Sequence, residues 1–306
     1  MLYDVIILGS GPAGLSAAIY AQRAKLNALV VEEKPLSGGQ ILDTYEVDNY
    51  PGMRGMSGFE LGMKFREHAD ALGVKFYTAQ VQKVRNADGW KEVVTDQDTL
   101  QAKTIILAMG ANHRKLGVPG EEALSGMGVS YCATCDGAFF KGKTVAVVGG
   151  GDVALEDALF LARGCEKVYL IHRREELRGA KILQEQVQQT ENIEILWNSE
   201  VKEIQGEGKV EKITVNNNIE ETDSQLEVQG VFIAVGIQPN NEAVKDVVAL
   251  DEQGYVKALE NTVTSQPGIF AAGDIRTKQL RQVITAAADG ANAVTSVERF
   301  LLQSSR

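Results

Sequence analysis

The chain has 306 residues, of which 44% are hydrophobic and 24% are charged, and its formal net charge is −10. A chain of this length favours about two domains, and the composition is typical of a globular protein. The acidic balance argues against a nucleic-acid-binding protein, and no apolar run approaches the roughly 18 residues of a membrane span. The N-terminus lacks the features of a signal peptide, and three cysteines are too few for a disulfide-stapled secreted fold. We therefore expect a cytoplasmic protein that binds neither nucleic acid nor membrane.

The first segment of the chain has the order strand, glycine-rich turn, helix, strand. Val5–Leu8 is a short apolar run typical of a buried strand, Leu15–Arg23 indicates a helix, and Ala28–Val31 indicates a second strand. The turn has the sequence GSGPAG, and Glu32 closes the second strand. An acidic residue about 20 positions after such a turn is typical of a dinucleotide-binding unit, whereas the turn alone would fit any tight loop.

The residues of this turn each have a physical reason to be there. Gly9 permits the tight turn, Gly11 lets the backbone approach a pyrophosphate at the helix N-terminus, and Gly14 allows the helix to pack closely on the strand. Glu32 can accept hydrogen bonds from a ribose diol. The turn also contains Pro12 and Ala13. The segment therefore predicts a site for an adenine dinucleotide.

A second segment, residues 143–174, repeats the first without gaps. Gly149, Gly151 and Ala154 stand at the positions of the three glycines, and Val145–Val148 stands at the position of the first strand. Asp152 and Val153 complete this second turn. Internal similarity of this kind indicates two copies of one structural unit.

The two copies differ where the second strand ends. His172, Arg173 and Arg174 replace Glu32, and Arg178 follows about one helical turn later. A carboxylate there holds a free 2′-hydroxyl and repels a 2′-phosphate, and a cationic cluster does the opposite. We therefore expect the second unit to bind NADPH and the first to bind a dinucleotide without a 2′-phosphate. The alternative is that the cations form only a solvated helix start.

The remaining patterns indicate that the second unit is inserted into the first. Ile105–Ala111, Val231–Ile237 and Gly268–Asp274 each look like a buried strand ending at a glycine turn, and a helix is expected over Gln282–Leu301. Polar stretches with Pro or Gly mark two crossings between the domains. The predicted fold is α/β, with two Rossmann-like dinucleotide-binding domains that comprise residues 1–112 with 245–306 and residues 113–244.

Between the two units, Cys132 and Cys135 have C-x-x-C spacing. A structural zinc site would need two further nitrogen or sulfur ligands, and neither Cys165 nor the three histidines form a second ligand pair. We therefore expect a redox-active dithiol and no metal. One sulfur would exchange electrons with a flavin, and the other would attack an external disulfide as a thiolate.

The residues that follow the dithiol allow two interpretations each. Asp136 could exchange the proton of the redox cycle, or it could be a turn residue of an Asp-Gly pair. Phe139 and Phe140 could belong to a core, or they could dock a protein partner. Cys165 is expected to be a small structural apolar residue.

Together these motifs resemble the low-molecular-weight thioredoxin reductases of the pyridine-nucleotide disulfide oxidoreductase superfamily. The resemblance covers essentially the whole chain and follows the family order: GSGPAG, GGQ, VDNYPG, CATCDGAFF, GGGDVA, HRREELR and AAGDIRTKQLRQVITAAADG. The CATCDG segment combined with HRRxxxR is highly specific, whereas each glycine motif alone is not. Met109 and Val153 stand where many members of the family have hydroxyl residues.

The resemblance implies FAD and NADPH as cofactors and assigns residues to them. FAD would contact the first glycine turn and Glu32, and the further residues implied are Gly39, Gln40, Asn49, Gly273, Asp274, Arg281 and Gln282. NADPH would contact Gly149–Ala154, with His172, Arg173, Arg174 and Arg178 around its 2′-phosphate. In this family the second cysteine, here Cys135, faces the flavin, and the first, here Cys132, attacks thioredoxin. Asp136 matches the family's acid/base, and a homodimer is implied.

Three other functions remain open on the sequence. A reductase that serves a peroxiredoxin or a glutaredoxin-like protein would use the same dithiol with a different partner. A ferredoxin:NADP reductase would have a similar architecture without the CATC segment. A redox sensor read by a binding partner would not need two complete nucleotide sites.

Overall fold

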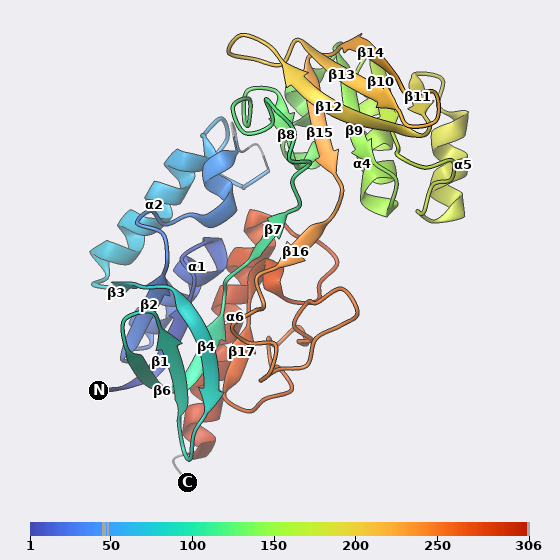
Figure 1. The fold of residues 1–306 in the computed structure, drawn as a ribbon. Helices are drawn as coiled ribbons and strands as arrows, with labels where there is room; N and C mark the ends of the chain where they lie inside the picture. Colours follow the sequence, from blue (N-terminus) through green and yellow to red (C-terminus); the bar gives the residue numbers. More distant parts are fainter. Residues whose placement is uncertain (45–46, 48, 305–306) are drawn as a thin grey trace. The chain divides into compact units, whose positions relative to one another are not determined.

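The computed structural model describes residues 1–44, 47 and 49–304, and the chain divides into two compact units, as the ribbon in Figure 1 shows. Unit 1 comprises the described residues of 1–42, 50–112 and 238–304, and unit 2 those of 43–49 and 113–237. Residues 238–244 therefore lie with unit 1 rather than with the second predicted domain. The reason is apolar packing, because Val244 is 1% exposed and belongs to the same apolar cluster as Ile6 and Leu8.

Unit 1 is built on a parallel sheet whose strands are apolar runs, as expected when both faces are covered. Its parallel strands are β1 (Leu2–Leu8), β2 (Ala28–Glu32), β3 (Phe76–Thr78), β6 (Thr99–Leu107) and β17 (Ile269–Ala271), in the order β3-β2-β1-β6, with β17 also pairing with β6. The antiparallel strands β4 (Val81–Asn86) and β5 (Lys91–Thr95) continue the sheet from β6. Residues Val5–Leu8 are fully buried, as the sequence predicts.

The helices of unit 1 are α1 (Pro12–Arg23), α2 (Gly58–Ala71) and α6 (Val283–Ser304), with short 3-10 turns η1 (Gly39–Asp43) and η3 (Gly273–Ile275). Figure 1 shows α1 and α6 side by side. A Cβ atom on Gly290 would lie 2.2 Å from the carbonyl oxygen of Ala13, so only glycine allows this approach of α6 to α1. Helix α1 begins three residues earlier than predicted, because Pro12 is well suited to a first helical position.

Unit 2 repeats this arrangement and adds a small antiparallel sheet. Its parallel strands are β8 (Val129–Ser130), β9 (Thr144–Gly149), β10 (Lys167–Ile171), β11 (Ile193–Leu196) and β15 (Gly230–Ala234), in the order β11-β10-β9-β15-β8. Its helices are α3 (Ala133–Asp136), η2 (Gly137–Phe140), α4 (Asp152–Ala162) and α5 (Lys181–Gln189). The added sheet consists of β12 (Ser199–Gln205), β13 (Lys212–Asn217) and β14 (Thr222–Glu227). Where the chain passes between the units, β7 (Ala111–His113) pairs with β16 (Ile237–Pro239).

The strand registers match the gapless overlay of the two sequence segments. In unit 1, Val5 of β1 lies beside Ala28 of β2. In unit 2, the two residues that the overlay assigns to these positions, Val145 and Val168, lie beside each other in the same way. Each unit therefore contains one copy of a Rossmann-like fold, which confirms the predicted fold class.

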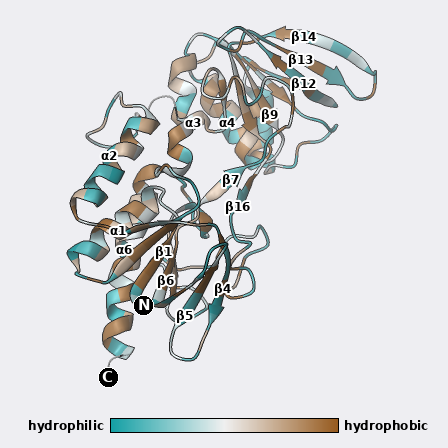
Figure 2. Ribbon diagram, turned by 60° about the vertical axis from the view of Figure 1, so that its left-hand side comes forward, coloured by the Kyte–Doolittle hydropathy of each residue, from teal (hydrophilic) through white to brown (hydrophobic). Residues whose placement is uncertain are grey.

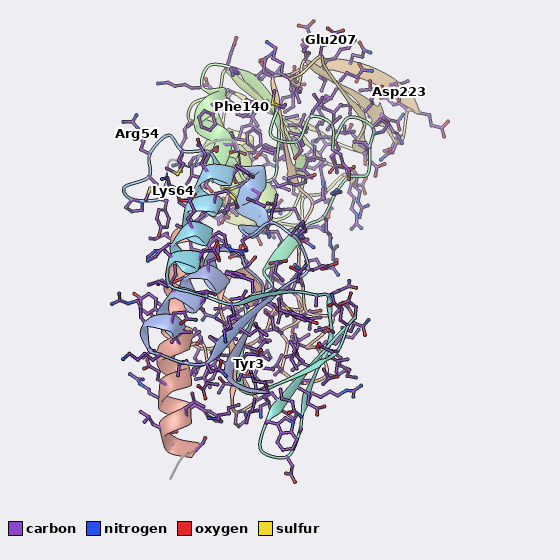
Figure 3. All side chains as sticks on the ribbon, turned by 90° about the vertical axis from the view of Figure 1, so that its left-hand side faces the viewer. Tyr3, Arg54, Lys64, Phe140, Glu207 and Asp223 are labelled. Atoms are coloured by element: carbon purple, nitrogen blue, oxygen red, sulfur yellow. A yellow bond between two sulfur atoms is a disulfide. The ribbon has the colours of Figure 1, made fainter. Side chains whose placement is uncertain are left out.

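Each unit has its own hydrophobic cores, and no apolar cluster of described residues draws on both. Strands β1, β6 and β9 are hydrophobic along most of their length, whereas β14 is largely hydrophilic (Figure 2). The exposed Glu207, in the loop between β12 and β13, and the exposed Asp223 of β14 point into solvent (Figure 3). Within the described ranges, the structure has no helix that is both long enough and apolar enough to cross a membrane.

Candidate active site

The first glycine turn joins β1 to α1, and its backbone is accessible at Gly11. Gly9 has φ of 101°, and a Cβ on Gly14 would lie 2.0 Å from the carbonyl oxygen of Gly9, so both positions require glycine. At Gly11 the nearest atom to an added Cβ is the carbonyl oxygen of Gly38 at 3.8 Å. The start of α1 therefore presents accessible backbone in the arrangement that favours an anion.

Glu32 ends β2 beside this turn, as predicted. One carboxylate oxygen accepts hydrogen bonds from the backbone N–H of Ser10 at 2.7 Å and from its hydroxyl at 2.8 Å. The other oxygen accepts from the backbone N–H of Lys34 at 3.1 Å. The sequence indicated the acid but not Ser10, whose hydrogen bonds fix the carboxylate against the turn.

Two distant segments meet the first glycine turn. The backbone N–H of Gly38 donates to the Ser10 carbonyl at 2.9 Å, and a Cβ on Gly39 would lie 3.2 Å from the Cα of Gly11. A Cβ on Gly273 would lie 2.9 Å from that of Ala13. The structure therefore brings the GGQ and AAGD motifs to the turn, and the Gln40 amide donates to the carbonyl of Ala111.

Two residues of the segment that begins with the AAGD motif, Asp274 and Arg281, each have a buried polar atom that could bind a ligand. Among the residues that the structure describes, none forms a hydrogen bond with the buried Oδ1 of Asp274 or the buried Nε of Arg281. Burial raises the pKa of Asp274, while the nearby charges of Lys278 and Arg281 oppose that rise. The Arg281 guanidinium lies 4.0 Å from the ring centre of Tyr255. Because buried polar groups are normally paired, these two atoms fit a ligand with hydroxyl and acceptor groups, such as FAD.

A buried ion cluster supports the Gly273–Asp274 turn. One carboxylate oxygen of Asp289 accepts from the Gly273 backbone N–H at 2.9 Å and from Lys278 at 2.9 Å, and the other accepts from Arg276 at 3.0 Å. The side chains of Arg276 and Lys278 are 8% and 7% exposed. Asp289 was not predicted, because it lies in the middle of α6 and has the appearance of an ordinary surface acid.

The second glycine turn, between β9 and α4, is covered by the HRREELR segment. The backbone N–H of Arg178 donates to the Gly150 carbonyl at 2.7 Å, and that of Ala180 donates to Asp152 at 2.7 Å. No atom of the described residues lies within 4 Å of a Cβ placed on Gly151, so this turn also has accessible backbone at its helix start. Ala154 is fully buried, and Val153 is 51% exposed.

A cavity of about 440 Å³ opens beside this turn. Its lining consists of Arg173, Arg174, Glu175, Glu176, Leu177, Arg178 and Asn198. Three guanidinium groups at one cavity fit a phosphate, since Arg binds phosphate through paired hydrogen bonds. Asn198 was not predicted. Its φ of 52° is a conformation that Asn tolerates, and its N–H donates to the Arg174 carbonyl at 3.2 Å.

His172 differs from the prediction, because the structure places it outside this cavity. The side chain is buried, its ring lies across Gly150, and its Nε2 pairs with the Glu176 carbonyl at 2.9 Å. Burial, reinforced by the charges of Arg178 and Arg174, lowers the pKa of His172. The residue therefore packs beneath the turn, where burial disfavours a positive charge on its ring.

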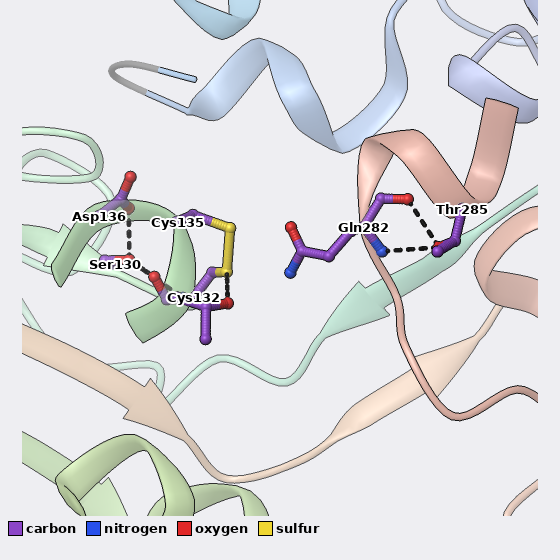
Figure 4. The surroundings of a disulfide bond; sticks show 7 residues. Ser130, Cys132, Cys135, Asp136, Gln282 and Thr285 are labelled. Atoms are coloured by element: carbon purple, nitrogen blue, oxygen red, sulfur yellow. Dashed lines mark hydrogen bonds between the residues drawn. A yellow bond between two sulfur atoms is a disulfide. The ribbon is translucent and has the colours of Figure 1, made fainter. Parts of the chain in front are cut away.

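Cys132 and Cys135 form a disulfide at the start of α3, with an S–S distance of 2.09 Å and a Cα–Cα distance of 5.3 Å (Figure 4). The backbone N–H groups of Cys135 and Asp136 donate to the Cys132 carbonyl at 3.2 and 3.1 Å. The spacing thus places both sulfurs on one turn, where they can form and break a bond without chain rearrangement. The redox assignment of this pair fits the structure.

Asp136 lies on the same turn as the disulfide. Burial raises the pKa of Asp136, and a hydrogen bond from the Ser130 hydroxyl to Oδ2, at 2.6 Å, opposes that rise. Its Oδ1 is buried and has no hydrogen-bond partner within the described part of the chain. A carboxyl group in these conditions holds its proton more tightly than an exposed one, which suits a group that exchanges protons with a thiol. Ser130 was not predicted.

The two phenylalanines that follow the dithiol differ. Phe140 is 8% exposed, packs edge-on against Phe232 with ring centres 5.2 Å apart, and lies within unit 2 (Figure 3). The structure therefore supports the core interpretation of Phe140, because the ring fills the core of unit 2. Phe139 is partly buried against the same cluster. Cys165 is buried, and its thiol donates to the Phe140 carbonyl at 3.3 Å, as expected of a structural residue.

Asn49 and Gln282 are two further predicted flavin contacts, and the structure gives the local surroundings of each. Asn49 is exposed and belongs to the segment that clusters with unit 2, and Asp48 of the same motif lies outside the described residues. The backbone N–H of Gln282 donates to the Thr285 hydroxyl at 3.2 Å just before α6. Their assignment to FAD remains a prediction.

Comparison with known proteins agrees with this geometry. The family model for pyridine nucleotide-disulphide oxidoreductases matches residues 3–290. The thioredoxin reductase of Bacillus subtilis is 43% identical over 98% of this chain and 95% of its own length, and that of Mycolicibacterium smegmatis is 48% identical over 99% and 97%. The crystal structure of thioredoxin reductase from Streptococcus pyogenes superimposes with a TM-score of 0.95, at 44% identity over 99% of both chains. The chain belongs to the pyridine nucleotide-disulphide oxidoreductase family, and within it to the thioredoxin reductases.

Proposed function

We propose that this protein is an NADPH-dependent thioredoxin-disulfide reductase that uses FAD and the Cys132–Cys135 pair. The observation that carries the proposal is the disulfide on one helical turn next to a half-buried carboxyl, in the same unit as a glycine turn and an arginine-lined cavity. The reaction of a ferredoxin:NADP reductase does not require this disulfide, and a redox sensor does not require two nucleotide sites.

Unit 1 would hold FAD. The open backbone at Gly11 would face the pyrophosphate, Glu32 would bind the ribose, and Asp274 and Arg281 would use their free buried atoms on the remainder of the cofactor. Asn49 and Gln282 are further proposed contacts. When bound, FAD supplies a carrier for an electron pair between the nicotinamide and the disulfide.

Unit 2 would hold NADPH. The open backbone at Gly151 would face its pyrophosphate, and Arg173, Arg174 and Arg178 would bind the 2′-phosphate in the cavity that they line. His172 would support the turn from beneath rather than contact the phosphate. Glu32 occupies the equivalent position in unit 1, where its carboxylate would repel a 2′-phosphate.

The chemistry at the dithiol follows from its residues. Two electrons open the Cys132–Cys135 bond, and the resulting thiolate of Cys132 attacks the partner disulfide. Cys135 then displaces the partner and restores the internal disulfide. Asp136 would hold and release the protons that this exchange requires.

The partner and assembly follow from the family and remain proposals. Thioredoxin would be the acceptor, with Phe139 near its docking site, and the enzyme would be a homodimer. Because thioredoxin keeps cytosolic thiols reduced, the reaction belongs to the cytoplasm.

The first test is NADPH oxidation by the purified protein with and without oxidised thioredoxin from the same source. A large thioredoxin-dependent rate is expected. Reduction of the flavin by NADPH without turnover would contradict thioredoxin as the partner, and a peroxiredoxin and a glutaredoxin-like protein would then be assayed. A flavin that NADPH does not reduce would contradict the donor.

A further inference from the structure

Ser130 joins the two chemical groups of the dithiol segment. It ends β8 and is 5% exposed, and its hydroxyl oxygen accepts from the Cys132 backbone N–H at 3.1 Å while its O–H donates to Oδ2 of Asp136 at 2.6 Å (Figure 4). Among the described residues, Ser130 provides the only hydrogen bond to this carboxyl. Both contacts are within normal hydrogen-bond distance.

The same hydroxyl can serve both protonation states of the carboxyl. When Asp136 is ionised, the Ser130 O–H donates to it. When Oδ2 carries a proton, the carboxyl can donate to Ser130, whose O–H can turn to the Cys132 carbonyl at 3.4 Å. The Cys132 backbone N–H remains bonded to Ser130 in both cases.

We propose that Ser130 is a positioning residue for the disulfide exchange: it holds the Asp136 carboxyl and the Cys132 backbone in one arrangement and reverses its hydrogen bond when Asp136 gains or loses its proton. This inference rests on the proposed function. Nothing in the sequence motif distinguishes Ser130 from an ordinary strand residue.

The exchange balances with Asp136 as the proton carrier. The Cys132 thiolate forms a bond to one partner sulfur and breaks the partner disulfide, and the departing partner thiolate takes the proton of Asp136. The ionised Asp136 then takes the proton of the Cys135 thiol. Cys135 attacks the Cys132 sulfur, restores the enzyme disulfide and releases the second partner thiolate, to which Asp136 gives its proton. Asp136 regains a proton from solvent.

The Ser130 hydroxyl influences how tightly Asp136 holds its proton. Burial raises the pKa of Asp136, and the Ser130 hydrogen bond is the one influence that lowers it. Helix α4 packs against α3 and carries the titratable groups Asp152, Glu156 and Asp157, whereas η2 carries none. Removing the hydroxyl should therefore make the carboxyl hold its proton to higher pH.

The test is the pH profile of the step in which the NADPH-reduced enzyme is oxidised by thioredoxin, between about pH 5 and 9. In the wild type the rate should fall as Asp136 loses its proton. In Ser130→Ala the falling limb should move to higher pH, and the rate below the limb should drop roughly tenfold because the carboxyl is no longer held. Ser130→Thr, which keeps the hydroxyl, should restore the wild-type limb.

Two controls make the result specific. Ser199 is a buried serine of the same unit whose hydroxyl donates to the Trp197 carbonyl at 2.7 Å, so Ser199→Ala should leave the limb in place. Asp136→Asn should have no limb, and adding Ser130→Ala to it should not create one. A Ser130→Ala profile with an unshifted limb and an equal loss at every pH would overturn the proposal.

A second measurement does not need turnover. Infrared difference spectra against Asp136→Asn report the protonated carboxyl band, which should persist to higher pH in Ser130→Ala than in the wild type. An unchanged titration would also overturn the role of Ser130. If the wild type shows no thioredoxin-dependent turnover, the proposed function fails, and this titration still tests the pairing of Ser130 with Asp136.

Discussion

At the scale of single residues, the proposed electron path runs from the flavin through Cys135 and Cys132 to the partner disulfide. We expect Cys135→Ser to retain FAD and to lose disulfide reduction, because one sulfur cannot complete the exchange. Flavin absorbance and thioredoxin-dependent NADPH oxidation measure the two properties. Cys165→Ala removes the buried free thiol and should retain turnover. Full activity in Cys135→Ser would contradict the dithiol mechanism.

The arginines of the cavity should determine the choice of NADPH. Arg173→Ala combined with Arg174→Ala should raise the KM for NADPH by at least about tenfold, because each charge-assisted hydrogen bond contributes roughly 1.5–3 kcal/mol. The KM for NADH should change little. Lys202→Ala with Lys209→Ala removes two exposed cations of the same unit outside the cavity lining and serves as the control. Equal losses for both nucleotides would contradict a 2′-phosphate site.

Asp157 on α4 should make stability depend on pH. Burial, together with the adjacent Glu156 charge, raises the pKa of Asp157 to about 7. The folded chain then keeps a proton that the unfolded chain releases near pH 4, so this group's contribution to stability is present below about pH 4 and is lost as the pH rises to about 7.

The stability advantage of Asp157→Asn over the wild type should therefore grow between these pH values and level off above them. Urea unfolding at a series of pH values measures the difference. Glu207→Gln, at an exposed acid, should show no such trend. An advantage for Asp157→Asn that is constant with pH would count against the assignment.

At the scale of elements, the Asp289 cluster ties α6 to the turn that contains Asp274. Asp289→Asn leaves Arg276 and Lys278 buried without their counter-charge, and breaking a buried pair in this way costs about 3–5 kcal/mol. Urea unfolding of the apoprotein measures the loss of stability, and flavin fluorescence should show weaker FAD binding because Gly273 loses a fixed acceptor.

A surface ion pair provides the matched control for Asp289. Asp246 bonds to Lys83 at 3.2 Å with both side chains exposed, so Asp246→Asn should cost less than about 1 kcal/mol and leave FAD binding unchanged. Equal effects of the two substitutions would show that the Asp289 cluster has no special role in positioning the turn.

The elements that sequence reasoning predicted well are those set by local pattern. The strand at Val5–Leu8, the glycine turns and the gapless second copy depend on residues close together in the chain. Ser130, Asn198 and Asp289 act through contacts that form only when distant segments pack, and no local pattern indicates them. The position of His172 beneath the second glycine turn was not expected for the same reason: neighbouring basic residues look alike in the sequence until packing buries one.

At the scale of the whole molecule, two units with separate hydrophobic cores should unfold in separate transitions. Calorimetry of the complete holoenzyme should resolve two transitions, and 2′,5′-ADP should raise only the one that belongs to unit 2. At about 100 times its Kd the ligand should add about 2.7 kcal/mol to that unit. A single transition that moves as a whole would contradict independent folding of the units.

The matched strand registers have a consequence for how such a protein can diversify. Under the proposed function, two copies of one scaffold would position their nucleotides alike, and the preference for one coenzyme over another would be set by a short segment that begins where one strand ends, at Glu32 in unit 1 and at Arg173 and Arg174 in unit 2. Coenzyme preference would then depend on a short segment of a fold that is present in two copies. Evolution or design could exchange that segment without changing the strands of the sheet.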